Sequence, residues 1–475
     1  MEQKEKASLE YKTTKSERIS YWFYFLGQNI FYGLIAINMQ TFYSDVGITA
    51  ASIAIILFIT KVWDAVNDPL LGILIDKIRF KNGRFMPWIR MALPAITVTS
   101  ILFFALPANG SPVLKIVWAT IAYAAWDMSY TLCDVPIFVL PTSMTDNVQE
   151  RGQLLTMGRY FAMIGIVGAS IALPILQARI GWFAVALIFS AIAAVTMIPL
   201  CFKGKERRVT RPEKEITLKQ MFKYVAGNKY LLIFYLAMFV SGVTYFNQYI
   251  GIFFARHNLG NQDLAGMISL LMMVPMLIVG ALLPSITKRV DKFKLYITCQ
   301  IAAAAVGIIM FLVGYSNITV FFVLYVLQSI FTSANNILLF TFTPDCLEYG
   351  TYHTGERAEG VAASVQTFFS KLVGSISGPI AMLILAGFGF VAGENAVQPE
   401  AVTTGIWLCY SLLPALGMIL AVIILKFYKL RDADIQIMAQ YNDGNITKKE
   451  ADSKLAGKYG VAAVPVNMTV SKTDS

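Results

Sequence analysis

The sequence predicts an all-α polytopic membrane protein. Of its 475 residues, 56% are hydrophobic and only 14% are charged, and the mean hydropathy is +0.60. A soluble domain carries about 25% charged residues. The apolar residues gather in segments of about 20 residues or more, the length at which an α-helix crosses a bilayer. This composition excludes a soluble enzyme, a secreted disulfide scaffold and a disordered chain.

Twelve apolar segments can be delimited to within a few residues, and they predict twelve transmembrane helices. An even number of crossings places both chain ends on the same side of the membrane. The segments are 20–44, 52–76, 88–107, 113–140, 155–178, 181–201, 230–255, 264–287, 293–314, 318–343, 361–389 and 403–427.

The basic residues predict which side holds the chain ends. Lys and Arg gather in alternate connections, with four in residues 77–84 and nine in residues 202–229. The six connections on the other face hold only Lys115, Arg179 and Arg256. By the positive-inside rule both termini are cytoplasmic. The net charge of +10 is therefore explained by a membrane surface, and nucleic acid is not expected as a partner.

The long basic connection 202–229 predicts a division into two halves. A six-helix bundle over residues 20–201 precedes it and a second over 230–427 follows it, with cytoplasmic tails at 1–19 and 428–475. We expect the C-terminal tail to form a short amphipathic helix at about 431–441, followed by a disordered end.

A weak internal repeat supports the two halves. Pro141 ends the fourth span and Glu150 follows it, while Pro344 ends the tenth span and Glu356 follows it, at offsets of 203 and 206 residues. Two six-helix halves in parallel repeat describe the major facilitator architecture, in which substrate binds between the halves at mid-membrane. The alternative is twelve helices in which these residues recur by coincidence.

Other motifs narrow the class of function. The five cysteines have no paired spacing, which argues against a disulfide framework and a zinc site. The sequence has no phosphate-binding GxxxxGK[ST] loop and no nucleophile–base or metal-ligand spacing. The polar first 20 residues contain no apolar core of a cleavable signal peptide. We therefore expect neither an enzyme nor a bound cofactor.

The second span carries ionisable residues that each cost about 2.5–3.5 kcal/mol at a helix centre. Lys61, Asp64 and Asp68 follow i, i+3, i+7 spacing and share one helical face, with Asn67 beside them. Two nearby carboxylates in low dielectric repel each other, and a bound Na⁺ or a shared proton would relieve that repulsion. The alternative is a Lys61–Asp64 ion pair that only fixes helix packing, which leaves Asp68 unexplained.

The fourth span offers a face suited to a sugar. Tyr130, Thr131 and Asp134 lie within about one helical turn and present a ring, a hydroxyl and a carboxylate. Sugar hydroxyls need hydrogen-bond acceptors such as this carboxylate and hydroxyl, and the C–H faces of a sugar pack well on an aromatic ring. For Asp127, nearer the outer half, a local polar role and a functional role both stay open.

Two basic residues lie in later spans, Arg159 in the fifth and Lys371 in the eleventh. A buried guanidinium such as that of Arg159 can form two hydrogen bonds to a carboxylate or to vicinal hydroxyls. Lys371 could balance the negative charge of the carboxylates in the second span, as part of a charge network with Lys61. Static packing pairs are the alternative for both. The intramembrane aspartates and basic residues leave a net charge of −1, which one monovalent cation would cancel.

The motifs of these spans, taken together, resemble the melibiose permease family, the glycoside–pentoside–hexuronide:cation symporters of the major facilitator superfamily. The resemblance covers residues 19–427. It rests on WDAVNDPLLG, GRFMPW, SYTLCDVP, GRYF, EYGTYHTGERAEG and QTFFSK.

The resemblance implies a cation site and a sugar site. Asp64 and Asp68 match the paired cation-site carboxylates, accompanied by Asn67 and Thr131. The match also implies a set of residues that bind sugar or line its cavity, namely Tyr130, Asp134, Arg159, Thr367 and Lys371. Within this set, the resemblance implies that Lys371 links the cation site to the sugar site.

Two departures put the sugar in doubt. Gln28 and Asn29 stand where melibiose-transporting members have a Lys–Asp pair, and Phe138 stands where they have a stacking Trp. Some uronide-transporting relatives resemble this chain at Asn29, but they often lack the aspartate that is retained here as Asp134. Whether the sugar is neutral or anionic therefore stays open.

These observations predict a secondary active symporter that imports a glycoside with Na⁺ or H⁺ by alternating access. We expect a multi-pass plasma-membrane protein that works as a monomer among lipids. Asn67 and Thr131 add neutral oxygen ligands, which favours Na⁺. The alternatives are a uronide or other anionic sugar as cargo, a lysolipid or other amphipathic anion, an uncoupled facilitator, and a non-transporting sensor.

Overall fold

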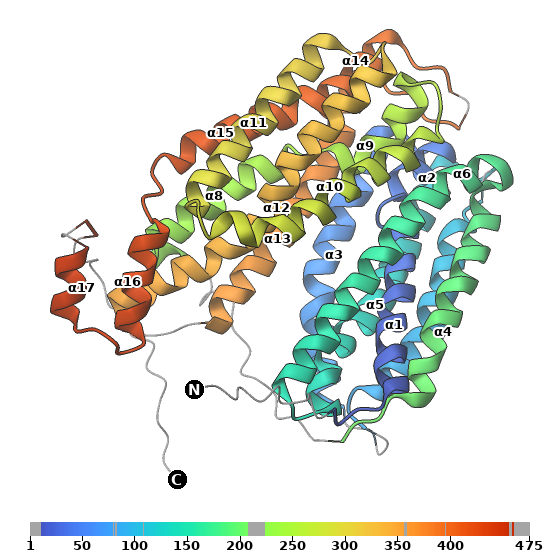
Figure 1. Ribbon diagram of the computed structural model, residues 1–475. Coiled ribbons are helices and arrows are strands. Elements are labelled where there is room, and N and C mark those ends of the chain that lie inside the picture. Colours follow the sequence, from blue (N-terminus) through green and yellow to red (C-terminus); the bar gives the residue numbers. More distant parts are fainter. Residues whose placement is uncertain are drawn as a thin grey trace. The chain divides into compact units, whose positions relative to one another are not determined.

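The computed structural model describes residues 11–78, 80, 83–107, 109–207, 224–355, 359–394, 396–455 and 458–459. Within these ranges, the regular structure is helical apart from one isolated bridge between Phe80 and Gly83 (Figure 1). The prediction of an all-α fold is confirmed.

The helices before residue 204 coincide with the first six predicted segments. They are α1 (Lys15–Ile35), α2 (Met39–Asp45), α3 (Ala50–Lys77), α4 (Met86–Phe104), α5 (Pro112–Met144) and α6 (Val148–Lys203).

The later helices coincide with the other six segments and add two helices in the C-terminal tail. They are α8 (Lys229–Val243), α9 (Asn247–Phe253), η1 (Phe254–Asn258), α10 (Leu264–Thr287), α11 (Lys292–Val313), α12 (Ile318–Thr354), α13 (Glu359–Gly387), α14 (Glu400–Trp407), η2 (Leu408–Leu412), α15 (Leu413–Leu425), α16 (Asp432–Asn442) and α17 (Lys448–Lys454).

Eight helices among the described residues are long and apolar enough to cross a membrane. One of them is α6, which is long enough for two crossings. The long helices α1, α3 and α5 are not among the eight, and these are the helices that carry most of the polar residues expected at the site. The chain is a multi-pass membrane protein, and the count of twelve spans stays a prediction.

Helix α6 consists of two rods joined at Gly181. Gly181 has a φ of +79°, a conformation that glycine adopts without steric cost. Residues on both sides of the bend pack on α1: a Cβ at Gly33 would lie 2.7 Å from Ala169, and a Cβ at Gly27 would lie 2.5 Å from the carbonyl oxygen of Ala193. The chain therefore folds back at Gly181, which agrees with the predicted break between segments 155–178 and 181–201 (Figure 1).

The described contacts divide the chain into two compact units that do not follow the sequence halves. Unit 1 comprises Met1–Glu213, Asn247–Leu270 and Gly378–Ile406, and unit 2 comprises Lys214–Phe246, Leu271–Ser377 and Trp407–Ser475. Short segments of the second half thus pack with the first half. The division of the sequence at the linker 202–229 stays a prediction, because residues 208–223 lie outside the described part.

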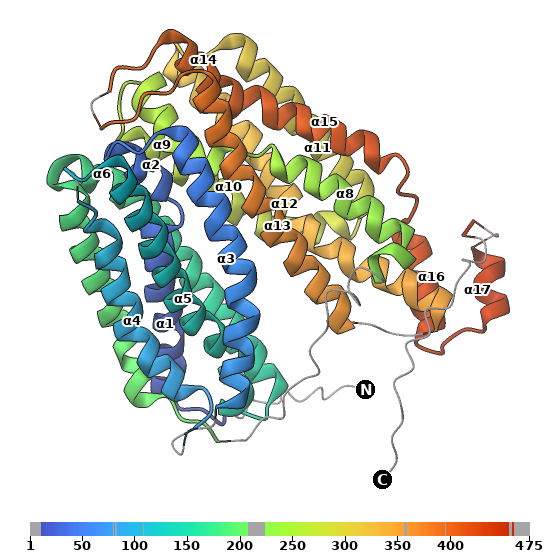
Figure 2. The same ribbon diagram turned by 180° about the vertical axis from the view of Figure 1, so that it is seen from behind.

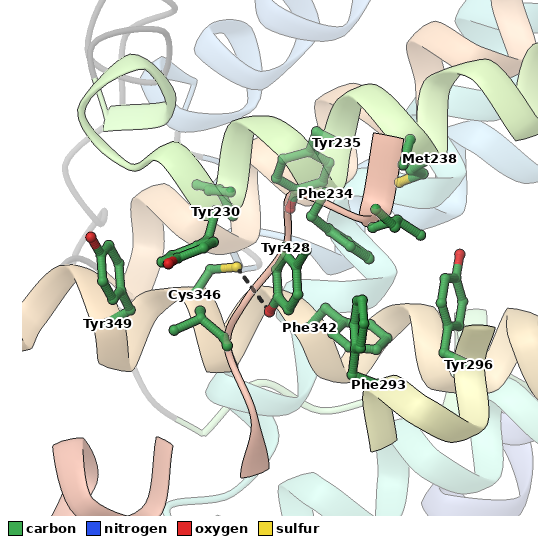
Figure 3. Close-up of a cluster of buried hydrophobic side chains, with 14 of the residues drawn as sticks. Tyr230, Phe234, Tyr235, Met238, Phe293, Tyr296, Phe342, Cys346, Tyr349 and Tyr428 are labelled. Atoms are coloured by element: carbon green, nitrogen blue, oxygen red, sulfur yellow. Dashed lines mark hydrogen bonds between the residues drawn. The ribbon is translucent and has the colours of Figure 1, made fainter. Parts of the chain in front are cut away.

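Unit 2 is built around a cluster of buried aromatic side chains (Figure 3). Tyr428 is the centre of the cluster, with its ring stacked on Phe293 at 5.0 Å between centroids and edge-on to Phe342 at 5.9 Å. Its hydroxyl lies 3.6 Å from the sulfur of Cys346. Aromatic pairs of this kind each contribute about 0.5–1.5 kcal/mol beyond area burial.

The C-terminal tail packs against unit 2 through polar contacts. The ammonium of Lys292 lies 2.8 Å from Asp345 and 3.4 Å from Asp432 at the start of α16. The amide of Asn442 at the end of α16 donates to Glu348 of α12 at 2.7 Å. The expected helix at 431–441 is confirmed as α16. The expectation of disorder after it is wrong for α17, whose start is capped by Thr447, and residues 460–475 lie outside the described part.

The close packing of α1 on α6 yields a stability prediction. A Cβ at Gly165 would lie 2.5 Å from the backbone oxygen of Leu26, whereas a Cβ at Gly168 would meet nothing within 4 Å. Gly165→Ala should cost about 1–3 kcal/mol through overpacking and lower the melting temperature of the purified protein. Gly168→Ala, one helical turn away, should be neutral or slightly stabilising. Equal melting temperatures for the two variants would contradict this packing.

A second prediction concerns Glu17, which lies before the first predicted span. Its burial alone would raise its pKa, but hydrogen bonds from Arg207 and Thr14 outweigh burial and lower the pKa of Glu17. The bonds from Arg207 measure 2.8 and 2.9 Å. A lowered folded-state pKa adds stability above the unfolded value of about 4.3, and that stability is lost as the pH falls through the folded value.

Glu17→Gln should therefore lower the free energy of unfolding by about 1–2 kcal/mol at pH 7, and this deficit should shrink as the pH falls below about 4.3 and on through the lowered pKa of the folded state. Thermal unfolding across pH measures this. Glu450 caps the exposed helix α17 through the same Thr-x-x-Glu motif, so Glu450→Gln is the matched control and should change stability less. A deficit for Glu17→Gln that is independent of pH would refute the ionic interpretation.

Candidate functional site

The polar residues expected at the site belong mainly to three helices of unit 1, α1, α3 and α5. Figure 2 labels these helices. Each helix begins at a polar capping residue before an apolar run: Thr14 before α1, Thr49 before α3 and Ser111 before α5. The side chains of Thr14, Thr49 and Ser111 each accept a hydrogen bond from a backbone N–H of the first turn, which fixes where each helix starts.

The ion pair of α3 is formed. Lys61 Nζ lies 3.6 Å from Asp64 Oδ2, and the two side chains are 29% and 19% exposed. The pair has the i, i+3 spacing expected from the sequence. The side chain of Asp68 lies outside the described part of the structure, so its place relative to Asp64 stays a prediction.

Asn67 joins α3 to α5. Its amide nitrogen donates to the hydroxyl of Thr131 at 3.2 Å and to a carboxylate oxygen of Asp127 at 3.4 Å. All three side chains are buried, with 3 to 6% of their surface exposed. The Thr131 hydroxyl in turn donates to the carbonyl of Asp127 at 3.1 Å. Two residues expected at the cation site, Asn67 and Thr131, are therefore in direct contact.

Gln28 joins α1 to the same helix α5. Its amide nitrogen donates to Asp134 Oδ1 at 2.6 Å, and the glutamine is fully buried. Asn29 bonds instead to its own helix, donating to the carbonyl of Phe25 at 2.9 Å. Of the two residues that replace the family's Lys–Asp pair, Gln28 therefore contacts the expected sugar carboxylate directly.

Aromatic rings lie beside these polar groups. The ring of Tyr130 packs against Tyr32 of α1 at 5.6 Å and against Trp126 of α5 at 5.4 Å between centroids. Tyr32 is 39% exposed, so one part of this aromatic row is open. Phe138, expected in place of a stacking Trp, is 38% exposed and packs edge-on against Phe25 at 5.2 Å.

The remaining expected residues lie on other helices. Arg159 is on α6 of unit 1 and is exposed. Thr367 and Lys371 are on α13 in unit 2, and both are exposed. The contacts within unit 1 thus join Asn67 of the second span to Thr131 of the fourth, and Gln28 of the first span to Asp134 of the fourth.

Sequence reasoning left Asp127 undecided and missed Tyr32 and Trp126. Asp127 precedes Thr131 by four residues, so both lie on one face of α5, and this spacing was a usable signal. Tyr32 follows Gln28 by four residues on α1 in the same way. Trp126 offered no comparable signal, because in a membrane span an aromatic residue is usually read as lipid-facing or interfacial.

Comparison with known proteins identifies the chain as a membrane transporter and not an enzyme. A sequence model of the family described as "MFS/sugar transport protein" matches residues 20–432. The chain therefore belongs to the MFS/sugar transport protein family, and the family predicted from the motifs, the glycoside–pentoside–hexuronide:cation symporters, is confirmed.

Two curated relatives and one solved structure illustrate the similarity. The isoprimeverose transporter of Lactiplantibacillus pentosus is 30% identical over 89% of this chain and 90% of its own length. The glucuronide carrier protein homolog of Escherichia coli (strain K12) is 26% identical over 86% of this chain and 91% of its own. The crystal structure of the nucleoside transporter NupG covers 86% of this chain and 99% of its own, at 14% identity and a TM-score of 0.61, and shows the fold alone.

The link between α3 and α5 yields a prediction about cation binding. Thr131→Val should weaken affinity for the expected coupling cation about tenfold, because it removes a hydroxyl that the sequence predicts as a ligand and leaves Asn67 without one acceptor. Isothermal titration with Na⁺ or with protons measures this. Thr120 on the same helix bonds only its own helix, at the carbonyl of Ile116, so Thr120→Val is the matched control. Equal cation affinity in both variants would exclude Thr131 as a ligand.

Proposed function

We propose that the protein is a secondary active symporter that carries a glycoside with Na⁺ or H⁺ by alternating access. One observation carries the proposal: Thr131, bonded to Asn67 of α3, and Asp134, bonded to Gln28 of α1, lie one turn apart on α5. A residue of the expected cation site and a residue of the expected sugar site therefore share a single rigid helix.

In the proposed mechanism the cation binds between Asp64 and Asp68, with Asn67 and Thr131 as neutral ligands. A cation there competes with Lys61 for the carboxylate of Asp64, whose present ion pair at 3.6 Å is long. Its binding fixes α3 against α5 and so orients Asp134. The coupling between two ligands is reciprocal and typically worth about 1–3 kcal/mol.

The sugar binds, in this proposal, against Asp134 and the ring of Tyr130. The carboxylate of Asp134 accepts hydrogen bonds from sugar hydroxyls. The exposed side of the Tyr32 ring packs against a C–H face of the sugar ring. Gln28 already donates a hydrogen bond to one carboxylate oxygen of Asp134. A sugar hydroxyl must therefore share that oxygen with Gln28 or displace the hydrogen bond. From the family resemblance we further assign Arg159, Thr367 and Lys371 as hydroxyl donors or charge partners, and Asn29 and Phe138 as further sugar-binding residues.

An anionic sugar is the second candidate. The exposed guanidinium of Arg159 is the observation that favours it, because Arg binds carboxylates through two parallel bonds. The similarity to a relative named as a glucuronide carrier adds support. Against it stands the carboxylate of Asp134, which would repel an anionic sugar, and Gln28, which donates to this carboxylate, brings no positive charge.

We further propose that the protein is a plasma-membrane monomer with both termini in the cytoplasm and needs no bound cofactor. The excess of Lys and Arg in alternate connections supports this orientation. Membrane lipid, a sugar and a monovalent cation are the expected partners.

A binding panel tests the substrate and the cation together. Nitrophenyl glycosides and glucuronides are titrated onto the purified protein, with and without Na⁺, at two pH values. Sugar affinity that rises about tenfold with Na⁺ at constant pH supports sodium coupling, and affinity that responds to pH alone supports proton coupling. Selective binding of the glucuronides supports the anionic sugar. Binding of no sugar would overturn the proposal in favour of a lysolipid cargo or a non-transporting sensor.

Cation coupling is tested by substitution. Asp64→Asn and Asp68→Cys should each abolish gradient-driven accumulation of the sugar while leaving measurable sugar binding, because only the cation site is lost. Asp146→Asn, at an exposed position after α5, is the control and should accumulate sugar normally. Full accumulation by Asp68→Cys with either cation would show that the cation site is assigned wrongly.

A further inference from the structure

A polar cluster joins the two sequence halves within unit 1, at the ends of the helices away from the basic connections. Its centre is an ion pair between Asp45, the last residue of α2, and Arg256 in η1. The guanidinium is bidentate: Nη1 contacts Oδ1, and Nη2 lies 3.1 Å from Oδ2. The two side chains are only 2% and 12% exposed.

Each member of the pair is held by a further residue of its own half. The indole N–H of Trp182, beside the bend of α6, donates to Asp45 Oδ2 at 2.9 Å. Arg256 Nε donates to Gln262 Oε1 at 2.9 Å, ahead of α10. Both charged groups are therefore oriented before they meet, which reduces the entropy lost when the pair forms.

Hydrogen bonds extend the contact beyond the ion pair. The amide nitrogen of Gln262 donates to the side-chain oxygen of Gln177 and, at 3.1 Å, to the carbonyl of Pro174, both on α6. Gln177 in turn donates to Glu394 at 3.0 Å, ahead of α14. Three segments that follow the linker thus bond to two that precede it.

Close backbone approach seals the same region. A Cβ at Gly266 of α10 would lie 2.7 Å from the carbonyl oxygen of Ile171 on α6. A Cβ at Gly378 of α13 would lie 3.0 Å from the side-chain nitrogen of Gln40 on α2. Helices of the two sequence halves therefore pack closely near the polar cluster.

We propose that the Asp45–Arg256 pair is a latch that holds the non-cytoplasmic end of the transporter closed. The inference rests on the proposed function, since alternating access requires the halves to separate at this end in every cycle. Separation breaks a buried ion pair, but both charged groups then return to water, so the two states stay close in free energy. The latch sets how often this end opens, and it binds neither the sugar nor the cation.

A spectroscopic distance tests the latch without any substrate. Spin labels are placed at Arg179→Cys on α6 and Glu400→Cys at the start of α14, both exposed. The five native cysteines are all buried and should label little. In lipid nanodiscs, Asp45→Asn and Arg256→Gln should each raise the ratio of long to short distances about fivefold or more.

The double variant and a matched control complete the test. Asp45→Asn combined with Arg256→Gln should open the end no further than either single change, because both remove the same interaction. Asp263→Asn neutralises an exposed carboxylate next to Gln262 and should leave the distances unchanged. Arg256→Lys keeps the positive charge but cannot form the bidentate contact, so it should open this end less than Arg256→Gln does. It serves as the test variant if the neutral variants do not reach the membrane.

Unchanged distances in Asp45→Asn, Arg256→Gln and Arg256→Lys would overturn the latch, as would an equal shift in Asp263→Asn. A pair that only stabilises the fold would lower the melting temperature without changing the distances, which also overturns it. Because no sugar or cation gradient enters the measurement, a failure of the proposed symport would show in the binding panel and not here.

Discussion

The cost of placing charge in hydrocarbon is the constraint on which the site depends. Within the described part of unit 1, the charged groups of α3 and α5 contact polar partners: Asp64 meets Lys61, Asp127 meets Asn67, and Asp134 meets Gln28. These contacts offset part of the cost of placing the charges in hydrocarbon. In the proposed mechanism a ligand therefore exchanges with an existing partner, so its binding is coupled to rearrangement of the helices.

That exchange explains how two ligands can sense each other without touching. Helix α5 is held by α3 through Thr131 and by α1 through Asp134, one turn apart. A change in either bond shifts a rigid rod, and the other bond moves with it. Gln28 differs from a lysine at this position because its neutral amide donates a hydrogen bond to Asp134 without adding a positive charge.

Local features were predictable from the sequence, and contacts between helices were not. The apolar segments, the shared face of Lys61 and Asp64, and the break before Gly181 follow from helical periodicity and composition. The partners of Asn67 and the ring of Tyr32 depend on how neighbouring helices are rotated about their axes, which periodicity does not specify. Helix α17 was missed because a seven-residue polar helix is stable only through its cap and its contact with the rest of unit 2.

The depth of an ion pair decides what it can do. Lys61 and Asp64 lie mid-span on α3, where separation would leave two charges in hydrocarbon, so in the proposed mechanism the cation replaces Lys61 at Asp64. Asp45 ends α2 and Arg256 lies within the short helix η1, and in the proposed latch their separation returns both charges to water at little cost. The first kind of pair suits a binding site and the second a reversible closure. A symporter needs both kinds, since its ligands must be released on one side only after the other side has closed.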